Sequence, residues 1–516
     1  MTEDTRSLFD YSALANAAYI ILDDYPSITD ELVIERATEQ GILPESLGND
    51  LFLYDSVNNP DAWLIPEGGY YTEHETGFAA TLFDNGTEKV LAIRGTELGG
   101  AQTYLDAVQA DLIQLGFYGF ALEQTVSMMN YILRLSTPID EYARQFRITL
   151  TSEAEGELSG IPIPVDDQTL YLNIDVITEE NGLGFSGLGL LDAADQVTVV
   201  GHSLGGHLSA MAARLFPGLI DQSYTFNSPG FDPEYSTELM AVLEIVSLGK
   251  TLLQKLGGTT LNEFLDDLFS GITSPAGLYE LKLTEPFVNS VAQYLPQLPE
   301  TSFIDANIYS YEAESFLPGD DISLLSGLLT NQEVSLGPVE NIALEGNTHS
   351  ISALMDTLAL QSLLLSLDNT FLFPDMAKMY SLSADTPGES EEGILTALHR
   401  LFVMDPEKST MIDQLNTLDV EKTSILGVET GIDLGFMYSA SIADRDTYYR
   451  LIQDIRDSDL YTQASGAVNI FPLAYEDIDG GLVPRSSQDL QSRAGTDVNG
   501  GMAYRYAVSY THLRAH

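Results

Sequence analysis

The sequence of 516 residues has no cysteine and few basic residues, with 22 lysines and arginines against 77 aspartates and glutamates. Without cysteine, the fold cannot depend on disulfide bonds. The formal net charge of −55 argues against nucleic acid as a partner and against electrostatic attraction to anionic membranes. Such a charge keeps a protein soluble and suits an exterior that is rich in divalent cations.

Long hydrophobic runs are absent as well. No stretch approaches the roughly 20 apolar residues that a membrane-spanning helix needs, so no transmembrane segment is expected. The first 20 residues lack a basic start and a hydrophobic centre, and therefore predict no cleavable signal peptide. This pattern is compatible with the cytoplasm and equally with export through a C-terminal signal.

The final segment, residues 508–516 (VSYTHLRAH), differs from the acidic body of the chain in its basic bias. It resembles sequence translated from an adapter, and it is left out of the fold prediction. On that interpretation, the natural C-terminus would be missing.

The most informative segment is residues 196–206, QVTVVGHSLGG. A β-branched apolar run predicts a buried strand, and residues 204–216 predict a helix that Pro217 stops. Between them, Gly-x-Ser-x-Gly predicts a tight strand-to-helix turn with Ser203 at its tip. Gly201 and Gly205 flank the serine because the backbones approach too closely there for side chains. We expect the Ser203 hydroxyl to stand at the top of a sheet as a nucleophile.

A serine nucleophile needs a histidine base, which follows the serine and the acid along the chain in α/β hydrolases. His349 lies in a polar loop between a predicted strand and a predicted helix, where this fold places its base. His399 lies inside a helical run and is expected to be structural. The other five histidines precede the serine, lie within the elbow or lie in the tail: 74, 202, 207, 512 and 516.

The third member of the triad is a carboxylate that orients the histidine. The segment NIYSYEAESFLPGDDIS supplies Glu312 and Glu314 at a strand end, and Asp320 and Asp321 after a Pro-Gly turn. Glu314 is favoured as the acid, and Asp320 and Asp321 remain alternatives.

The oxyanion formed in acyl transfer needs two preorganised donors. The backbone N–H of Leu204, which follows the nucleophile, is the first expected donor. Thr96 is the second, because it follows the apolar strand of VLAIRGTEL and offers an N–H and a hydroxyl.

The remaining pattern predicts an α/β fold with a mostly parallel sheet flanked by helices. Residues 78–83 and 89–94 predict a hairpin, and residues 1–370 form the predicted catalytic domain. Residues 232–303 are an apolar helical insertion, expected to act as a lid or cap. Residues 371–507 predict a mainly helical second region. The other expected helices cover residues 8–22, 107–135 and 351–365, and the other expected strands cover 169–177, 223–226, 307–311 and 342–344.

The motifs AIRGTE, GHSLGGHLSAMAARLFP, YTFNSPGF and NTHSISALMDTLAL follow one another in this order. With them, residues 8–370 resemble bacterial lipases of the α/β-hydrolase fold, most closely the calcium-dependent RTX lipases exported by type I secretion. The resemblance implies a secreted or cell-surface lipase or esterase with structural calcium. Two features depart from that family: Glu312-Ala313-Glu314 stands where an Asp-containing loop is usual, and the glycine-rich repeat domain is absent.

These observations predict a serine carboxylic ester hydrolase that acts on acylglycerols or related lipid esters. No cofactor enters the chemistry, and contact with a lipid–water interface is expected through the lid. Two alternatives stay open: a phospholipase or peptidase of the same fold, and a catalytically inactive hydrolase-like module of a large surface protein.

Overall fold

The computed structural model describes the chain in separate segments. These are residues 5–57, 59–95, 120–154, 158–165, 168–177, 185–192, 194–233, 284–292, 294–295, 307–314, 332–334, 339–343, 350–369, 394–395, 398–399, 401–403, 442–466, 474–476 and 482–484.

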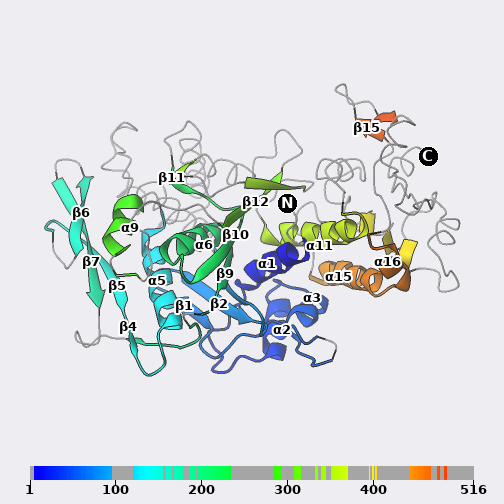
Figure 1. Ribbon diagram of the computed structural model, residues 1–516, viewed down its shortest axis with the longest axis horizontal. Coiled ribbons are helices and arrows are strands. Elements are labelled where there is room, and N and C mark those ends of the chain that lie inside the picture. Colours follow the sequence, from blue (N-terminus) through cyan, green and yellow to red (C-terminus); the bar gives the residue numbers. More distant parts are fainter. Residues whose placement is uncertain are drawn as a thin grey trace, which may run out of the picture.

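Within these residues, a sheet of seven strands lies at the centre of the molecule, in the order β1-β2-β3-β9-β10-β12-β14 (Figure 1). Its strands are β1 (Tyr70–Glu73), β2 (Phe78–Asp84), β3 (Lys89–Ile93), β9 (Val197–His202), β10 (Ile220–Phe226), β12 (Ile308–Glu314) and β14 (Val339–Ala343). The first three pair antiparallel, and every pair from β3 onward is parallel. The predicted hairpin and the mostly parallel sheet are therefore confirmed, and the carboxyl ends of five strands meet at one edge.

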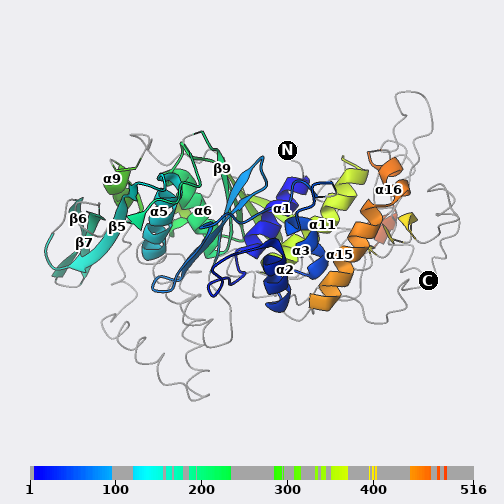
Figure 2. The ribbon, with the colours of Figure 1, turned by 90° about the horizontal axis from the view of Figure 1, so that it is seen from below.

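Alternating side chains along the strands divide the interior into two cores, because successive residues of a strand point to opposite faces. Val200 and Phe226 belong to the core under α1 (Thr5–Ala17) and α11 (Ile351–Leu367). Val199 and Ile93 belong to the core under α5 (Leu122–Ser136) and α6 (Leu204–Leu215). Helices therefore cover both faces of the sheet, which two perpendicular views show (Figures 1 and 2).

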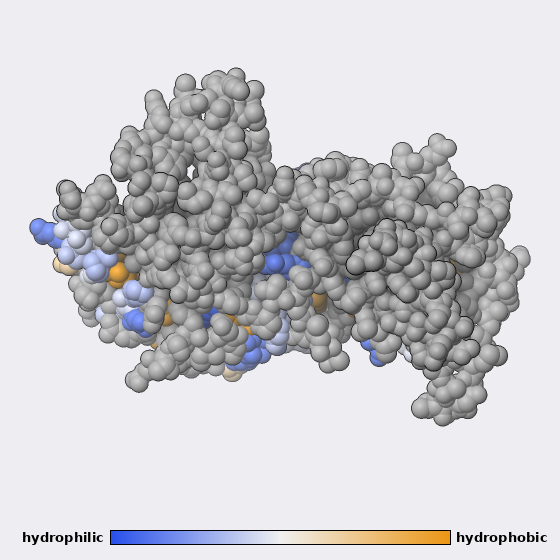
Figure 3. Space-filling model, turned by 90° about the horizontal axis from the view of Figure 1, so that it is seen from above, coloured by the Kyte–Doolittle hydropathy of each residue, from blue (hydrophilic) through white to orange (hydrophobic). Residues whose placement is uncertain are grey.

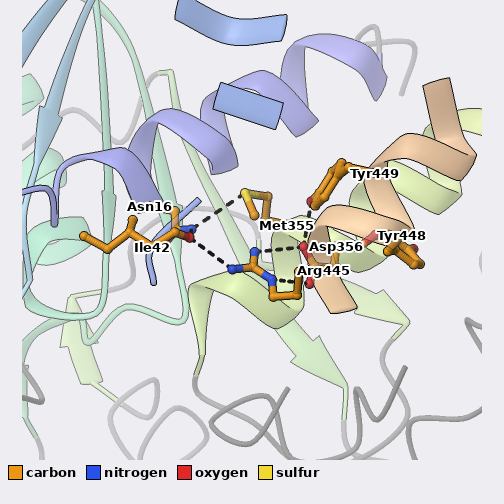
Figure 4. A network of polar contacts seen from close by, with 7 residues as sticks. All are labelled: Asn16, Ile42, Met355, Asp356, Arg445, Tyr448 and Tyr449. Atoms are coloured by element: carbon orange, nitrogen blue, oxygen red, sulfur yellow. Dashed lines mark hydrogen bonds and ion pairs between the residues drawn. The ribbon is translucent and has the colours of Figure 1, made fainter. Parts of the chain in front are cut away.

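The layer of α1 and α11 continues into α2 (Asp30–Glu39), α3 (Glu45–Phe52), α15 (Ile442–Arg456) and α16 (Asp459–Ala464). A buried ion pair joins α11 to α15: Arg445 Nε and Nη2 donate to the two carboxylate oxygens of Asp356 at 2.9 and 3.0 Å. Tyr449 donates to the same carboxylate at 2.6 Å (Figure 4). Residues 442–466 thus share a core with the predicted catalytic domain, while the predicted boundary at residue 370 stays a prediction.

A second sheet was only partly predicted. β7 (Gln168–Ile177), the expected strand over 169–177, lies outside the central sheet, between β5 (Gln145–Thr151) and β6 (Leu158–Val165). All pairs in this sheet are antiparallel. Pro162 and Pro164 fit the edge strand β6, where a missing backbone N–H breaks no ladder. Seen from above, the described surface at this end is mostly hydrophilic, with isolated hydrophobic residues (Figure 3).

The predicted insertion over 232–303 is described in part. Its helix α9 (Thr284–Ala292) packs into the core under α5 and α6, with Phe287 fully buried and 5.0 Å from the ring of Phe120. No helix among the described residues is long and apolar enough to span a membrane. Short paired strands complete the described chain: β4 (Tyr142–Ala143) with β8 (Phe185–Ser186), β11 (Phe231–Pro233) with β13 (Gln332–Val334), and β15 (Ala474–Glu476) with β16 (Leu482–Pro484).

Candidate active site

Ser203 occupies a strained turn between β9, which ends at His202, and α6, which begins at Leu204. Its backbone has φ 55° and ψ −129°, a conformation that non-glycine residues rarely adopt. Such a residue costs about 1–3 kcal/mol and persists only where the surroundings enforce it. The Ser203 N–H donates to the Phe226 carbonyl at 2.9 Å, and the Ser203 carbonyl accepts from the N–H of Gly206 at 3.0 Å. The neighbouring strand and the first helical turn therefore hold the serine in place.

Two glycines allow this turn to close. A Cβ atom on Gly201 would lie 2.2 Å from the Gly205 carbonyl oxygen, and one on Gly205 would lie 2.1 Å from the Ile93 carbonyl oxygen. Both distances are far below van der Waals contact, so neither position has room for a side chain. The predicted strand–turn–helix geometry and the predicted reason for Gly201 and Gly205 are confirmed.

The end of β3 lies against the same turn. A Cβ atom on Gly95 would lie 2.5 Å from the His202 carbonyl oxygen and 3.3 Å from Ser203 Cβ. The chain that leads into Thr96 therefore passes beside Ser203, while Thr96 itself lies outside the described residues. Leu204 is the first residue of α6, where a backbone N–H has no acceptor within its own helix. Together with the positive end of the helix dipole, this N–H favours negative charge next to Ser203.

The segments expected to carry the acid and the base reach the same edge of the sheet. β12 ends at Glu314, which pairs with Ala343 at the end of β14, and α11 begins directly after Ser350. His349, Asp320, Asp321 and the side chain of Glu314 lie outside the described residues. Their predicted roles stay predictions.

Glu312, also on β12, is half-buried, and burial raises the pKa of its carboxyl to about 7. A group with that pKa carries a proton about half of the time at neutral pH. β12, the strand to which the prediction assigns the acid, therefore carries a half-ionised carboxyl two residues before its carboxyl end.

His207, on α6, has a structural role. Its Nδ1 lies 2.9 Å from the Gly230 carbonyl oxygen, and its Nε2 accepts from the N–H of Ala121 at 3.3 Å. These partners require the neutral ring with the proton on Nδ1, which then donates to Gly230. Burial lowers the pKa of His207 to about 3. The ring hydrogen-bonds the chain after β10 and the chain before α5 to α6, the helix that begins directly after Ser203.

His399 lies near the C-terminal end of α11, away from the end that begins after Ser350. Its Nε2 is 3.5 Å from a carboxylate oxygen of Asp454 on α15. Nearby, Phe402 packs edge-on against Tyr461, whose hydroxyl contacts Ser366. At 1.5 Å of rise per residue, Ser366 lies about 24 Å along the helix from Ser350. The surroundings of His399 fit the structural role that its helical context predicts.

Metal binding has no support in the part of the chain that the structure describes: no group of three or more His, Cys, Asp or Glu side chains there could hold an ion.

No family model, curated protein or solved structure matches this chain. The described residues place a half-buried serine on a strained turn, with the first N–H of α6 beside it and the end of β3 packed against it. A helix N–H in this position is a donor that can stabilise a negative charge developing next to a serine.

Proposed function

We propose that this protein is a serine carboxylic ester hydrolase of the α/β-hydrolase type. The observation that carries the proposal is the backbone of Ser203, with φ 55° and ψ −129°, at the carboxyl edge of a mostly parallel sheet and at the start of α6. A strained serine between a strand and a helix is the arrangement in which α/β hydrolases expose their nucleophile. The resemblance to RTX lipases supports lipid esters such as acylglycerols as the substrate class.

In the proposed reaction, Ser203 Oγ attacks the ester carbonyl carbon while His349 accepts the serine proton. The carbonyl oxygen becomes an oxyanion that accepts hydrogen bonds from the N–H of Leu204 and from Thr96. Collapse of the tetrahedral intermediate breaks the ester C–O bond, and His349 returns the proton to the departing alcohol. Water, deprotonated by His349, then attacks the acyl carbon; the bond to Ser203 breaks, the acid is released and His349 returns the proton to Ser203 Oγ. Glu314 orients the imidazole throughout.

The helical insertion over 232–303, apart from its buried helix α9, is proposed to cover the acyl-binding region as a lid. If so, activity rises when the substrate aggregates, because an interface favours the open lid. Rates that stay flat across the critical micelle concentration would reject the lid but leave the triad untouched. Structural calcium and type I export rest on the resemblance alone, and no step above uses a metal.

The direct test is labelling with a fluorophosphonate, which reacts covalently with activated serines. Wild-type protein should be labelled at Ser203, and Ser203→Ala should lose the label and lower ester hydrolysis by about 10³- to 10⁶-fold. Ser152→Ala, at an exposed serine directly after β5, is the matched control and should behave as wild type. Folded wild-type protein that takes no label would instead indicate an inactive hydrolase-like module.

The base and the acid are assigned by substitution. His349→Ala should abolish most activity without unfolding the protein, whereas His399→Ala should leave the chemistry intact. Among Glu314→Ala, Asp320→Ala and Asp321→Ala, the variant that removes the orienting acid should lose about 10⁴-fold in kcat. A panel of p-nitrophenyl esters, triglycerides, phospholipids and peptides then separates a lipase from a phospholipase or a peptidase.

A further inference from the structure

The nucleophile turn has a polar neighbour from a distant part of the chain. Tyr19, two residues beyond the end of α1, places its hydroxyl 3.0 Å from Nδ1 of His202, the residue before the nucleophile. The His202 ring is buried, at 4 % exposure, whereas Tyr19 is half-buried. The hydrogen bond therefore joins the residue next to Ser203 to the first helix of the protein.

The same hydroxyl lies against the end of β3. A Cβ atom on Gly95 would be 2.5 Å from Tyr19 Oη, 2.5 Å from the His202 carbonyl oxygen and 3.3 Å from Ser203 Cβ. The tyrosine hydroxyl, the turn and the nucleophile thus surround one point that only a glycine can leave free. Gly95 is also the residue from which the chain continues into the predicted oxyanion donor.

Tyr19 is itself held in place. Its N–H donates to the Asn16 carbonyl at 3.1 Å, and the Asn16 side chain donates to the Ile42 carbonyl at 3.0 Å. The same Ile42 carbonyl accepts from Arg445, which belongs to the buried ion pair with Asp356 (Figure 4). The end of α1, next to Tyr19, is therefore linked to α15 and α11 by hydrogen bonds through the Ile42 carbonyl.

We propose that Tyr19 is a positioning residue of the active site, which fixes the separation between Ser203 and the strand end at Gly95 through its hydrogen bond to His202. The inference rests on the proposed hydrolase function and assigns a residue that the predicted triad and oxyanion donors do not include. Its physical basis is preorganisation: the oxyanion is stabilised only if both donors already stand at the correct distance from the serine. A misplacement of about 1 Å can cost 10²-fold in rate.

The test compares Tyr19→Phe, which removes only the hydroxyl, with Tyr54→Phe, an exposed tyrosine on the loop after α3. Fluorophosphonate titration counts intact active sites, so kcat per site is independent of any loss of folded protein. We expect Tyr19→Phe to lower kcat by about 10-fold with KM unchanged, because the lost interaction acts on the transition state and not on substrate binding. Binding of a boronic acid, which forms a tetrahedral adduct, should weaken by a similar factor.

A second variant separates positioning from general stability. If the effect comes from the hydrogen bond, His202→Phe should lower kcat as well. The kcat of the double variant Tyr19→Phe with His202→Phe should then be no lower than that of the less active single variant. A Tyr19→Phe enzyme with kcat within twofold of wild type, or with only a raised KM, overturns the inference while the hydrolase function stands. A wild-type protein that takes no label and cleaves no ester overturns the proposed function, and the inference with it.

Discussion

The turn at Ser203 and the Asp356–Arg445 pair are both buried, but they hold the chain by opposite means. At the turn, three backbones pack together because glycines leave no side chain between them: Gly205 against Ile93, and Gly201 against Gly205. Around Asp356, charged and aromatic side chains fill the space, and each polar group of the pair meets a partner. Close packing fixes distances, whereas the ion pair fixes which helices meet.

The comparison also separates two kinds of cost. A strained φ at Ser203 is retained although it destabilises the fold, which is typical of sites where the strain serves the chemistry. A buried ion pair contributes little net stability compared with apolar residues of the same size, yet breaking it by removing one partner is expensive. The turn at Ser203 should therefore tolerate no added side-chain atom, and the Asp356–Arg445 pair should tolerate no unpaired charge.

The largest effect is expected for Gly205→Ala. The new methyl group would lie 2.1 Å from the Ile93 carbonyl oxygen and 2.8 Å from the backbone nitrogen of Gly95, and backbone atoms cannot rotate away as a side chain can. We expect a loss of more than about 4 kcal/mol in the free energy of unfolding, measured by urea denaturation, or failure to give folded protein. Gly86→Ala, at φ +83° with nothing within 4 Å, isolates the backbone cost and should lose about 1–2 kcal/mol. Equal losses at the two glycines would contradict the steric argument.

The next largest loss of stability is expected when the Asp356–Arg445 ion pair is broken. Asp356 is 0 % exposed. Arg445→Met removes the positive charge that pairs with its carboxylate but leaves the hydrogen bond from the Tyr449 hydroxyl. We expect it to lower the free energy of unfolding by about 3–5 kcal/mol. The double variant Asp356→Leu with Arg445→Met should recover part of that loss, since no charge is left unpaired. A double variant less stable than Arg445→Met alone would show that the pair stabilises the fold outright.

The two regions also differ in how far the sequence alone could predict them. The turn at Ser203 is specified by residues 196–206, and its geometry follows from a local pattern of glycines and β-branched residues. Asp356 and Arg445 are 89 positions apart. In the sequence of α15, Arg445 lies between two aspartates, a pattern typical of an exposed residue. Tyr19 and His202 are 183 positions apart, so no local pattern joins them.

The second sheet shows a different limit. Gln145–Thr151 alternates polar and apolar residues, which is a usable strand signal that the sequence prediction did not take up. Its existence was therefore predictable, but its separation from the central sheet was not, because partner choice depends on where α5 and α9 leave apolar surface. The triad assignments have the same limit: chain order narrows the candidates, but hydrogen-bond geometry decides among them.

A pH-dependent effect is expected at His207, beside the turn. In the unfolded chain its pKa is near 6.5, and burial lowers the pKa to about 3 in the folded protein. Between these values the unfolded state binds a proton that the folded state does not, so stability falls as the pH falls from 6.5 toward 3. The slope from this one group is up to about 1.4 kcal/mol per pH unit. His207→Gln, which can still donate and accept, should show a shallower decline in urea titrations between pH 6.5 and 4, and an unchanged slope would contradict the buried neutral histidine.

The smallest effect is expected one and a half helical turns from Arg445, at Arg450. This residue pairs with Asp446 at 3.0 Å on the same helix, but its side chain is 60 % exposed. Water already solvates both charges, so Arg450→Met should change the free energy of unfolding by less than about 0.5 kcal/mol. Both arginines lie on α15 and contact an aspartate at about 3 Å, but Arg445 is buried and donates to both carboxylate oxygens, whereas Arg450 is exposed and donates to one. If Arg450→Met proved as costly as Arg445→Met, burial would not be what makes the Asp356 pair important, and the contrast between the two regions would have to rest on the position of α15 instead.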